Sequence, residues 1–355
     1  MQLLKEISEL SHEFGMVDYV RGGGGNTSAK DDETLWVKPS GVSLAELTSE
    51  TFVAMDRKKL ARLYHVAAPP EPNARESLVK DIMAAAVRPG SSGRASVEAP
   101  LHNTFDGRFV VHTHPAIVNG MTCAVNGAEV CRGLFPEALW IEYTDPGYTL
   151  CMKVRQEIEV YKSHHGREPS VAFLKNHGVF VAGNSSDEIR RSYADIFQTL
   201  KKEYQKAHIS TRLDIGDLPE TDKIDKAKKL LRSTSCEQET TFITVCGAFD
   251  PADGPISPDH IVYSKAFPLL AEPTQEAMRD FVVRYGYTPG VIVWDGVVCG
   301  LGTSQKIAAL ALELAQDGAL IKQLAEAFGG IRYMTDEAIG FIEKWEVESY
   351  RKTQI

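Results

Sequence analysis

The sequence lacks the cysteine patterns that indicate disulfide frameworks or cysteine-based metal sites. No CxxC pair occurs among its six cysteines, which are Cys123, Cys131, Cys151, Cys236, Cys246 and Cys299. It also lacks an apolar run near the roughly 20 residues that span a bilayer, and its N-terminus has no apolar core of a signal peptide. We therefore expect a reduced, cytoplasmic protein with no membrane partner.

An excess of positive charge is also missing. The 355 residues carry 39 lysines and arginines against 48 aspartates and glutamates, which gives a net charge of −9. This balance disfavours nucleic acid as a partner. The composition, 43% hydrophobic and 25% charged, is typical of a globular protein, and the length predicts two domains.

Two histidines end an apolar run at residues 109–114, Phe-Val-Val-His-Thr-His. In a strand, residues i and i+2 face the same way, so His112 and His114 aim both imidazoles at one point. Such a pair suits a divalent transition metal, zinc first among them. His177 follows another apolar strand and precedes a glycine, which makes it the best third imidazole.

Glu98 lies 14 residues before His112, and its role has three interpretations. It is a metal ligand, a proton-transferring base, or a residue at a helix N-terminus that the helix dipole favours. Two loops raise similar alternatives. The four glycines before Asn26 cradle an anion or form a flexible turn. Ser40 and Gly41, after a strand, present a hydroxyl and an N–H group to a ligand or form an ordinary turn.

The remaining pattern predicts a chain of mixed helices and strands. We interpret residues 66–94 as an excursion over the surface, and residues 208–240 as a polar linker. The linker separates a first domain at 1–207 from a second α/β domain at 241–355 that has no metal site. The periodicity predicts helices at 2–16, 77–86, 115–124 and 151–163, strands at 34–38 and 52–56, and a strand, turn and strand at 134–150.

The second half echoes the first. Residues 177–189 can be laid on residues 295–307, which are 118 positions later, and each stretch joins an apolar strand to an amphipathic helix. Residues 259–265 similarly resemble the strand and turn at 34–38. Duplication and a shared strand-turn-helix pattern both account for the echo. In this alignment Asp295 stands where the first half has His177, so a copy would have lost its metal site and kept a structural role.

Five motifs together resemble the class II aldolase/adducin family, in particular its fuculose-phosphate and rhamnulose-phosphate aldolases. The similarity covers residues 1–207, and the pair of histidine motifs is its most specific part. The motifs are Gly25-Asn26-Thr27-Ser28, Lys38-Pro39-Ser40-Gly41, Ser96-Val97-Glu98, His112-Thr113-His114 and Asn176-His177-Gly178.

This resemblance implies an α/β fold of the α+β type, with a central, largely antiparallel sheet flanked by helices and a smaller second α/β domain. It implies a Zn²⁺ ion, with Mn²⁺ or Co²⁺ as substitutes, held by Glu98, His112, His114 and His177. It also implies that Glu98 transfers the proton and that the protein forms a homo-oligomer, a tetramer. The implied substrate- and phosphate-binding residues are Gly25, Asn26, Lys38, Ser40, Gly41 and Ser96.

The implied activity is retro-aldol cleavage of a sugar or sugar phosphate, a ketose, through a metal-stabilised enediolate. Related epimerases, dehydratases and decarboxylases use the same scaffold, and a non-catalytic adducin-like module is a further alternative. Val97 replaces a serine of the aldolases, which weakens the case for a phosphorylated substrate, whereas Lys38 or Arg21 would bind a phosphate or a carboxylate by charge. No general acid can be aligned; Tyr143, Tyr148 and Glu137 stay unassigned.

Overall fold

The computed structural model describes residues 2–91, 93–234 and 242–345. They form two compact units, each described by itself below. Unit 1 contains residues up to Val118 together with Gly127–Leu200, and unit 2 contains Asn119–Asn126 together with the described residues from Lys201 onward. The predicted domain limits of 1–207 and 241–355 stay a prediction.

Unit 1 is built on a seven-stranded sheet with the order β3-β2-β1-β4-β7-β6-β5. Every neighbouring pair is antiparallel except β5 and β6. The predicted α/β fold with a largely antiparallel central sheet is therefore confirmed. The strands are β1 (Asn26–Lys30), β2 (Thr34–Val37), β3 (Val53–Asp56), β4 (Phe109–Thr113), β5 (Leu139–Ile141), β6 (Val171–Leu174) and β7 (Gly178–Gly183).

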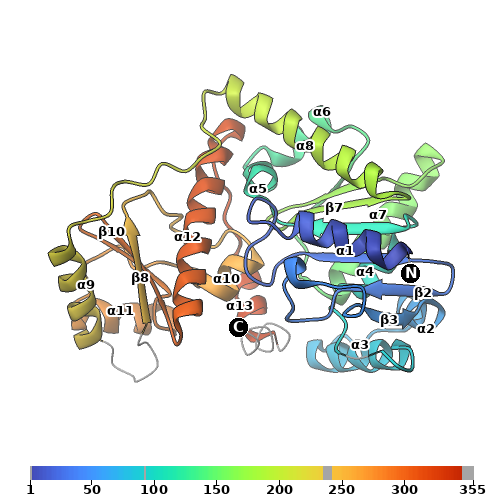
Figure 1. Cartoon of the computed structure of the whole chain (residues 1–355), viewed down its shortest axis with the longest axis horizontal. Helices are drawn as coiled ribbons and strands as arrows, with labels where there is room; N and C mark the ends of the chain where they lie inside the picture. Colours follow the sequence, from blue (N-terminus) through green and yellow to red (C-terminus); the bar gives the residue numbers. More distant parts are fainter. Residues whose placement is uncertain (1, 92, 235–241, 346–355) are drawn as a thin grey trace. The chain divides into compact units, whose positions relative to one another are not determined.

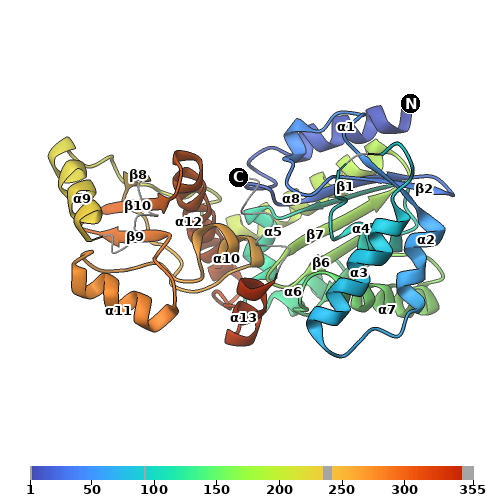
Figure 2. The same cartoon turned by 90° about the horizontal axis from the view of Figure 1, so that it is seen from below.

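Helices cover both faces of this sheet (Figure 2). On one face, α1 (Gln2–Phe14) and α8 (Ser186–Lys206) touch through the rings of Phe14 and Tyr193, whose centroids lie 4.3 Å apart. On the other face, α4 (Ala99–Thr104) and α7 (Tyr148–His165) share a buried apolar cluster with β7. The shorter elements are η1 (Leu44–Glu46), α2 (Arg57–Ala61), η2 (Arg62–His65), α5 (Ala116–Thr122) and α6 (Gly127–Leu134).

Two predictions for unit 1 are wrong. Residues 66–94 are no surface excursion, because they contain α3 (Pro72–Ala86), whose Val79 and Met83 are buried in one cluster with residues of β2 and β3. Residues 134–150 do not form two strands: they hold only β5, and α7 already begins at Tyr148. The helix predicted at 77–86 is present within α3, but its packing against β2 and β3 could not be read from the sequence. At residues 134–150 the apolar spacing was too short to separate a helix from a strand.

Unit 2 contains a three-stranded antiparallel sheet with the order β8-β10-β9. Side chains of β10 alternate: Val298 packs with α12, whereas Cys299 and Leu301 pack with α9 and α11. Figure 1 shows α9 and α12 on opposite sides of the strands. The elements are α9 (Thr221–Thr234), β8 (Phe242–Gly247), α10 (Pro258–Ser264), α11 (Gln275–Tyr285), β9 (Val291–Trp294), β10 (Val297–Gly302), α12 (Gln305–Ala325), η3 (Glu326–Phe328) and α13 (Asp336–Lys344).

Both halves contain a hairpin followed by a long helix, but two details of the predicted repeat are wrong. Residues 259–265 lie in helix α10 and the residue after it, not in a strand, because Ser257 and Pro258 start a helix there. The matching offset is 119 residues rather than 118. Strand β10 begins and ends 119 residues after β7, and helix α12 begins and ends 119 residues after α8. His177 therefore has no counterpart at Asp295, because the β9–β10 hairpin is one residue shorter.

The region predicted as a linker also contributes to the core. Its helix α9 inserts Leu231, which is buried, into the cluster between α11 and β10. Residues 235–241 and Cys236 lie outside the described residues, while the five other cysteines are free thiols. Within the described ranges, we find no helix with both the length and the apolar character needed to cross a membrane.

Candidate metal centre

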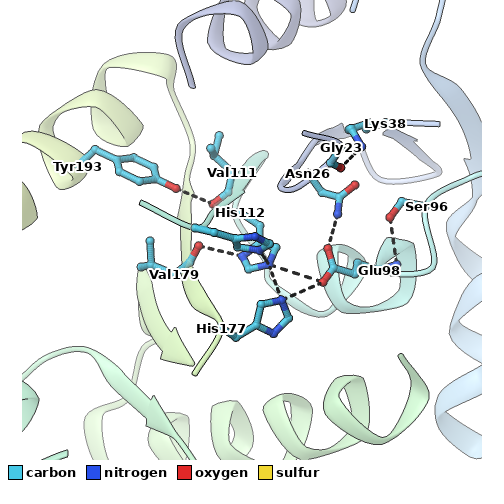
Figure 3. A network of polar contacts seen from close by, with 11 residues as sticks. Gly23, Asn26, Lys38, Ser96, Glu98, Val111, His112, His177, Val179 and Tyr193 are labelled. Carbon is cyan, nitrogen blue, oxygen red and sulfur yellow. Dashed lines mark hydrogen bonds and ion pairs between the residues drawn. The ribbon is translucent and has the colours of Figure 1, made fainter. Parts of the chain in front are cut away.

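Three imidazoles converge at the end of β4. His112 lies on β4, His114 directly follows its last residue, and His177 lies in the β6–β7 hairpin beside it. Figure 3 shows His112 and His177 next to each other. The Nε2 atom of His112 lies 2.9 Å from Nε2 of His114 and 3.4 Å from Nε2 of His177. One ligand atom from each histidine lies within 4.8 Å of the others. The structure thus brings all three predicted histidines together.

The local backbone explains this convergence. The carbonyl of Val179 on β7 accepts a hydrogen bond from Nδ1 of His112 at 3.0 Å. A carbonyl only accepts, so Nδ1 carries the proton and Nε2 keeps its lone pair. Gly178 gives the rings room, since a Cβ atom there would lie 2.3 Å from the Thr113 carbonyl and 2.7 Å from a ring carbon of His114. Asn176 takes the left-handed conformation (φ 53°) that the tight hairpin needs.

These nitrogens fit a divalent cation. Ligand atoms in a tetrahedral zinc site with bonds of about 2.0–2.1 Å are about 3.4 Å apart. The two measured separations, 2.9 and 3.4 Å, are of this order. Bare lone pairs at such distances repel one another unless a cation or a proton lies between them. The donor set of neutral imidazoles is that of zinc, and it also suits cobalt and other first-row metals.

Glu98 lies at the edge of this cluster. Its Oε1 atom is 3.6 Å from Nε2 of His112 and 3.9 Å from Nε2 of His177. Its other oxygen accepts a hydrogen bond from the side-chain amide of Asn26. Glu98 is buried and directly precedes α4, so this helix fixes its position beside the histidines. Its Oε1 atom is thus placed to bind an ion or to exchange a proton beside one.

The loops predicted to bind substrate meet at one end of β1 and β2. The backbone N–H of Lys38 donates to Thr27, and that of Ser96 donates to the Lys38 carbonyl, both at 3.1 Å. The N–H of Ser40 donates to the Arg94 carbonyl at 2.8 Å, which sets Ser40 and the exposed Gly41 beside the same segment.

Within this group of loops, the Lys38 ammonium is buried and donates to the Gly23 carbonyl at 3.3 Å (Figure 3). Gly25 has φ 70°, and a Cβ atom there would lie 2.8 Å from the His112 carbonyl. The glycine loop therefore packs directly against the strand that carries the histidines.

Glu137, Tyr143 and Tyr148 stay without an assigned role in the site. Glu137 is exposed and pairs with Arg167 at 2.8 Å. Burial raises the pKa of both the Tyr143 and the Tyr148 phenol. The glycine after His177, Gly178, was expected from the sequence to allow close approach. Sequence reasoning missed Phe180, because nothing in the sequence marked its ring, which stacks 3.8 Å from that of His112.

A family model and a protein of known sequence match this chain. A family model described as the class II aldolase and adducin N-terminal domain matches residues 5–199. A protein of Bacillus subtilis (strain 168), described as the uncharacterized oxidoreductase YuxG, is 22% identical over 420 residues, which covers 99% of this chain and 59% of that protein. The chain thus spans about three fifths of that relative's length.

Solved structures also resemble part of this chain. The N-terminal class II aldolase domain of a conserved Thermoplasma acidophilum protein is 22% identical, with a TM-score of 0.47, and the match covers 56% of this chain and 91% of that one. L-Fuculose-1-phosphate aldolase from Thermus thermophilus is 15% identical, with a TM-score of 0.38, and the match covers 59% of this chain and 96% of that one.

Proposed function

The chain belongs to the class II aldolase and adducin family, and from this premise we propose that it is a zinc-dependent carbon–carbon lyase. Its reaction is the retro-aldol cleavage, or the reverse aldol condensation, of a ketose or ketose phosphate. The observation that carries the proposal is the group of three imidazole nitrogens with the Glu98 carboxylate 3.6 Å from one of them. An adducin-like assembly module has no need of such a donor set.

The centre divides the chemistry among a few residues. His112, His114 and His177 would hold the ion, and Glu98 would be its fourth ligand when no substrate is bound. When bound, a divalent ion supplies Lewis acidity that stabilises negative charge developing beside a ketone. Glu98 then moves a proton at the neighbouring carbon, and its bond from Asn26 keeps the carboxylate oriented.

Substrate binding falls to the loops at the ends of β1 and β2. Gly25, Asn26, Ser40, Gly41 and Ser96 offer backbone or side-chain donors to a distal oxyanion. The buried Lys38 ammonium adds positive charge to this group of loops. Val97 is half-buried and offers no hydroxyl, so this cradle suits a carboxylate as well as a phosphate.

Related reactions are the second choice. A 4-epimerase, a dehydratase and a decarboxylase of sugar phosphates all need an ion and a nearby proton-transferring group, which the same residues supply. The oxidoreductase name is that of a relative longer than this chain. We also propose a homo-oligomer, a tetramer, in the cytoplasm, with a sugar or sugar phosphate as its small-molecule partner.

A retro-aldol screen tests the proposal. Ketoses and their phosphates would be supplied with zinc, manganese or cobalt, and the released aldehyde would be measured. We expect release from one substrate class, its loss in His112→Ala, and its retention in His164→Ala, which removes an exposed histidine. Epimer formation or CO₂ release without aldehyde would move the assignment to a related reaction. Equal turnover by the His112→Ala variant would contradict the proposed centre.

A further inference from the structure

One face of β1 carries three polar side chains in a row. Asn26, Ser28 and Lys30 alternate along the strand, so they point to the same face, and their exposed fractions are 1%, 0% and 3%. Thr27 points to the opposite face, where its hydroxyl lies 2.7 Å from that of Ser11 on α1. Three consecutive buried polar residues on one face need partners in the neighbouring layer.

All three find their partners in or beside α4. Asn26 donates to the Glu98 carboxylate, which directly precedes this helix. The Ser28 hydroxyl lies 2.8 Å from Nδ1 of His102, in the middle of the helix. Lys30 donates to the carbonyl of His102 at 2.6 Å and to that of Phe105. We call these three contacts the β1 ladder.

The lysine contact stabilises the end of a helix that is short. α4 has only six residues, whereas isolated helices shorter than about 12–15 residues are marginal in water. Its last carbonyls lack partners within the helix, and the Lys30 side chain donates a hydrogen bond to one of them, that of His102. Lys30 therefore fixes the C-terminal end of α4, while Asn26 fixes the residue at its start.

The contact of Ser28 with His102 links β1 to both Glu98 and His112. His102 follows Glu98 by one helical turn, and its N–H donates to the Glu98 carbonyl at 2.9 Å. The His102 ring meets the Phe180 ring edge-on at 5.4 Å, and Phe180 stacks on His112 at 3.8 Å. Burial lowers the pKa of His102 to about 3, so its ring is neutral. Among the described residues, the Ser28 hydroxyl is the one hydrogen-bond partner of this ring.

We propose that Ser28 is a positioning residue for Glu98: through His102 it sets the rotation of α4, and with it the distance of the Glu98 carboxylate from the three imidazoles. This inference rests on the proposed function, in which Glu98 transfers the proton. Ser28 touches neither substrate nor ion, so its effect passes entirely through His102 and the helix. Loss of the hydroxyl leaves the buried ring unpaired and lets the helix turn.

The test compares two neighbouring residues of β1. Ser28→Ala removes the contact to α4, whereas Thr27→Val removes a buried hydroxyl contact of similar length on the opposite face. Loss of a group behind a metal ligand typically costs about 10–100-fold in activity or metal affinity. We expect Ser28→Ala to lower kcat by about 10–100-fold with little change in KM. Thr27→Val should leave kcat within about 3-fold, and Ser28→Thr should restore most of the loss.

Two further readouts separate positioning from a general loss of stability. The visible absorption spectrum of the cobalt-loaded protein should change in Ser28→Ala toward that of Glu98→Gln and should stay unchanged in Thr27→Val. In the Glu98→Gln background, Ser28→Ala should have no additional effect on kcat, because both changes remove the same function.

Equal kcat losses in Ser28→Ala and Thr27→Val, or an unchanged cobalt spectrum in Ser28→Ala, would overturn the inference. Full additivity with Glu98→Gln would do the same. If no ketose is cleaved at all, the proposed function fails. The cobalt spectra then still decide whether Ser28 controls the position of Glu98, so the two failures are distinguishable.

Discussion

The β6–β7 hairpin of unit 1 and the β9–β10 hairpin of unit 2 are framed alike. Each follows a helix that ends at a left-handed glycine, Gly166 in α7 and Gly286 in α11. Each leads to a 21-residue helix that begins after a capping serine, Ser185 before α8 and Ser304 before α12. The strand order β4-β7-β6 also matches β8-β10-β9. The two units therefore share the same arrangement of a helix, a hairpin and a long second helix.

The positions of His112 and His114 in unit 1 carry other residues in unit 2. In unit 1, His112 on β4 pairs with Phe180 on β7. In unit 2, the matching residues are Val245 on β8 and Cys299 on β10, so Val245 takes the place of His112. In the same register, the position of His114 falls on Gly247. A Cβ atom at Gly247 would lie 1.9 Å from the carbonyl oxygen of Gly216, so no side chain fits there.

Unit 1 also has a strand with no counterpart among the described residues of unit 2. In unit 1, β1 lies beside β4 and carries the ladder to α4 and Glu98. Among the described residues of unit 2, no strand lies beside β8 on that side. The strand-turn-helix arrangement alone therefore accounts for packing. The proposed metal centre also needs the histidine side chains, open space for their rings, and a neighbouring strand that supports the Glu98 carboxylate.

Among the predicted changes, removal of a histidine should have the largest effect on zinc affinity. In His112→Ala, we expect zinc affinity to fall by more than about 100-fold, since even loss of a group behind a ligand costs about 10–100-fold. Val245→Ala, at the matching position of unit 2, should leave zinc affinity unchanged. Competition with a chelator of known affinity measures both. Equal affinity in His112→Ala and the unaltered protein would place the ion elsewhere.

Removal of the carboxylate should separate rate from binding. Glu98→Gln keeps the size of the side chain, so we expect zinc to stay bound with an affinity lowered by about 10-fold or more. The turnover rate should fall by about 10²–10⁴-fold, the usual contribution of general acid–base catalysis. Steady-state kinetics with metal analysis of the same sample checks this. A variant with full turnover would remove Glu98 from the mechanism.

Gly178 should be less replaceable than a glycine that has open space at its Cβ position. In Gly178→Ala, the new methyl group would lie 2.3 Å from the Thr113 carbonyl and 2.7 Å from the His114 ring. Such overpacking costs about 1–3 kcal/mol, and it should displace His114 and weaken zinc binding. Gly133→Ala has open space at its Cβ and serves as the control. Denaturant unfolding and zinc titration should show losses in the first variant only.

The buried lysine of β1 gives the smallest effect. Burial lowers the pKa of Lys30 from 10.5 to about 7. Between these two values the unfolded chain binds a proton that the folded protein does not. The free energy of unfolding should therefore rise with pH, by up to about 1.4 kcal/mol per pH unit from this group. Lys30→Met should flatten that rise, which denaturant unfolding at several pH values between about 7 and 9.5 would measure. An unchanged slope would contradict the shift.

Much of unit 1 follows from local sequence rules. Alternation along a strand placed His112 and His114 on one face, and an apolar strand ending before a glycine identified His177 as their neighbour. The partners of Ser28 and Lys30 could not be predicted, because they are reached only after β1 and α4, more than 70 residues apart, pack together. A missing hairpin residue likewise hid the true register of the repeat.

In unit 2, one feature could have been predicted from the sequence and another could not. The start of α10 carried a readable signal, since Ser257 and Pro258 are favoured at helix starts, yet the resemblance to an earlier strand outweighed it. The filling of the space beside Gly247 by Gly216 had no such signal, because it depends on a segment about 30 residues earlier in the chain.

X-ray absorption on the zinc-loaded protein, with the metal content of the same sample, tests the central contrast most directly. The account predicts one zinc per chain, surrounded by nitrogen and oxygen atoms at about 2.0–2.2 Å with at least three imidazoles and no sulfur. Two zinc ions per chain, a sulfur shell at about 2.3 Å, or no tightly bound zinc would contradict it.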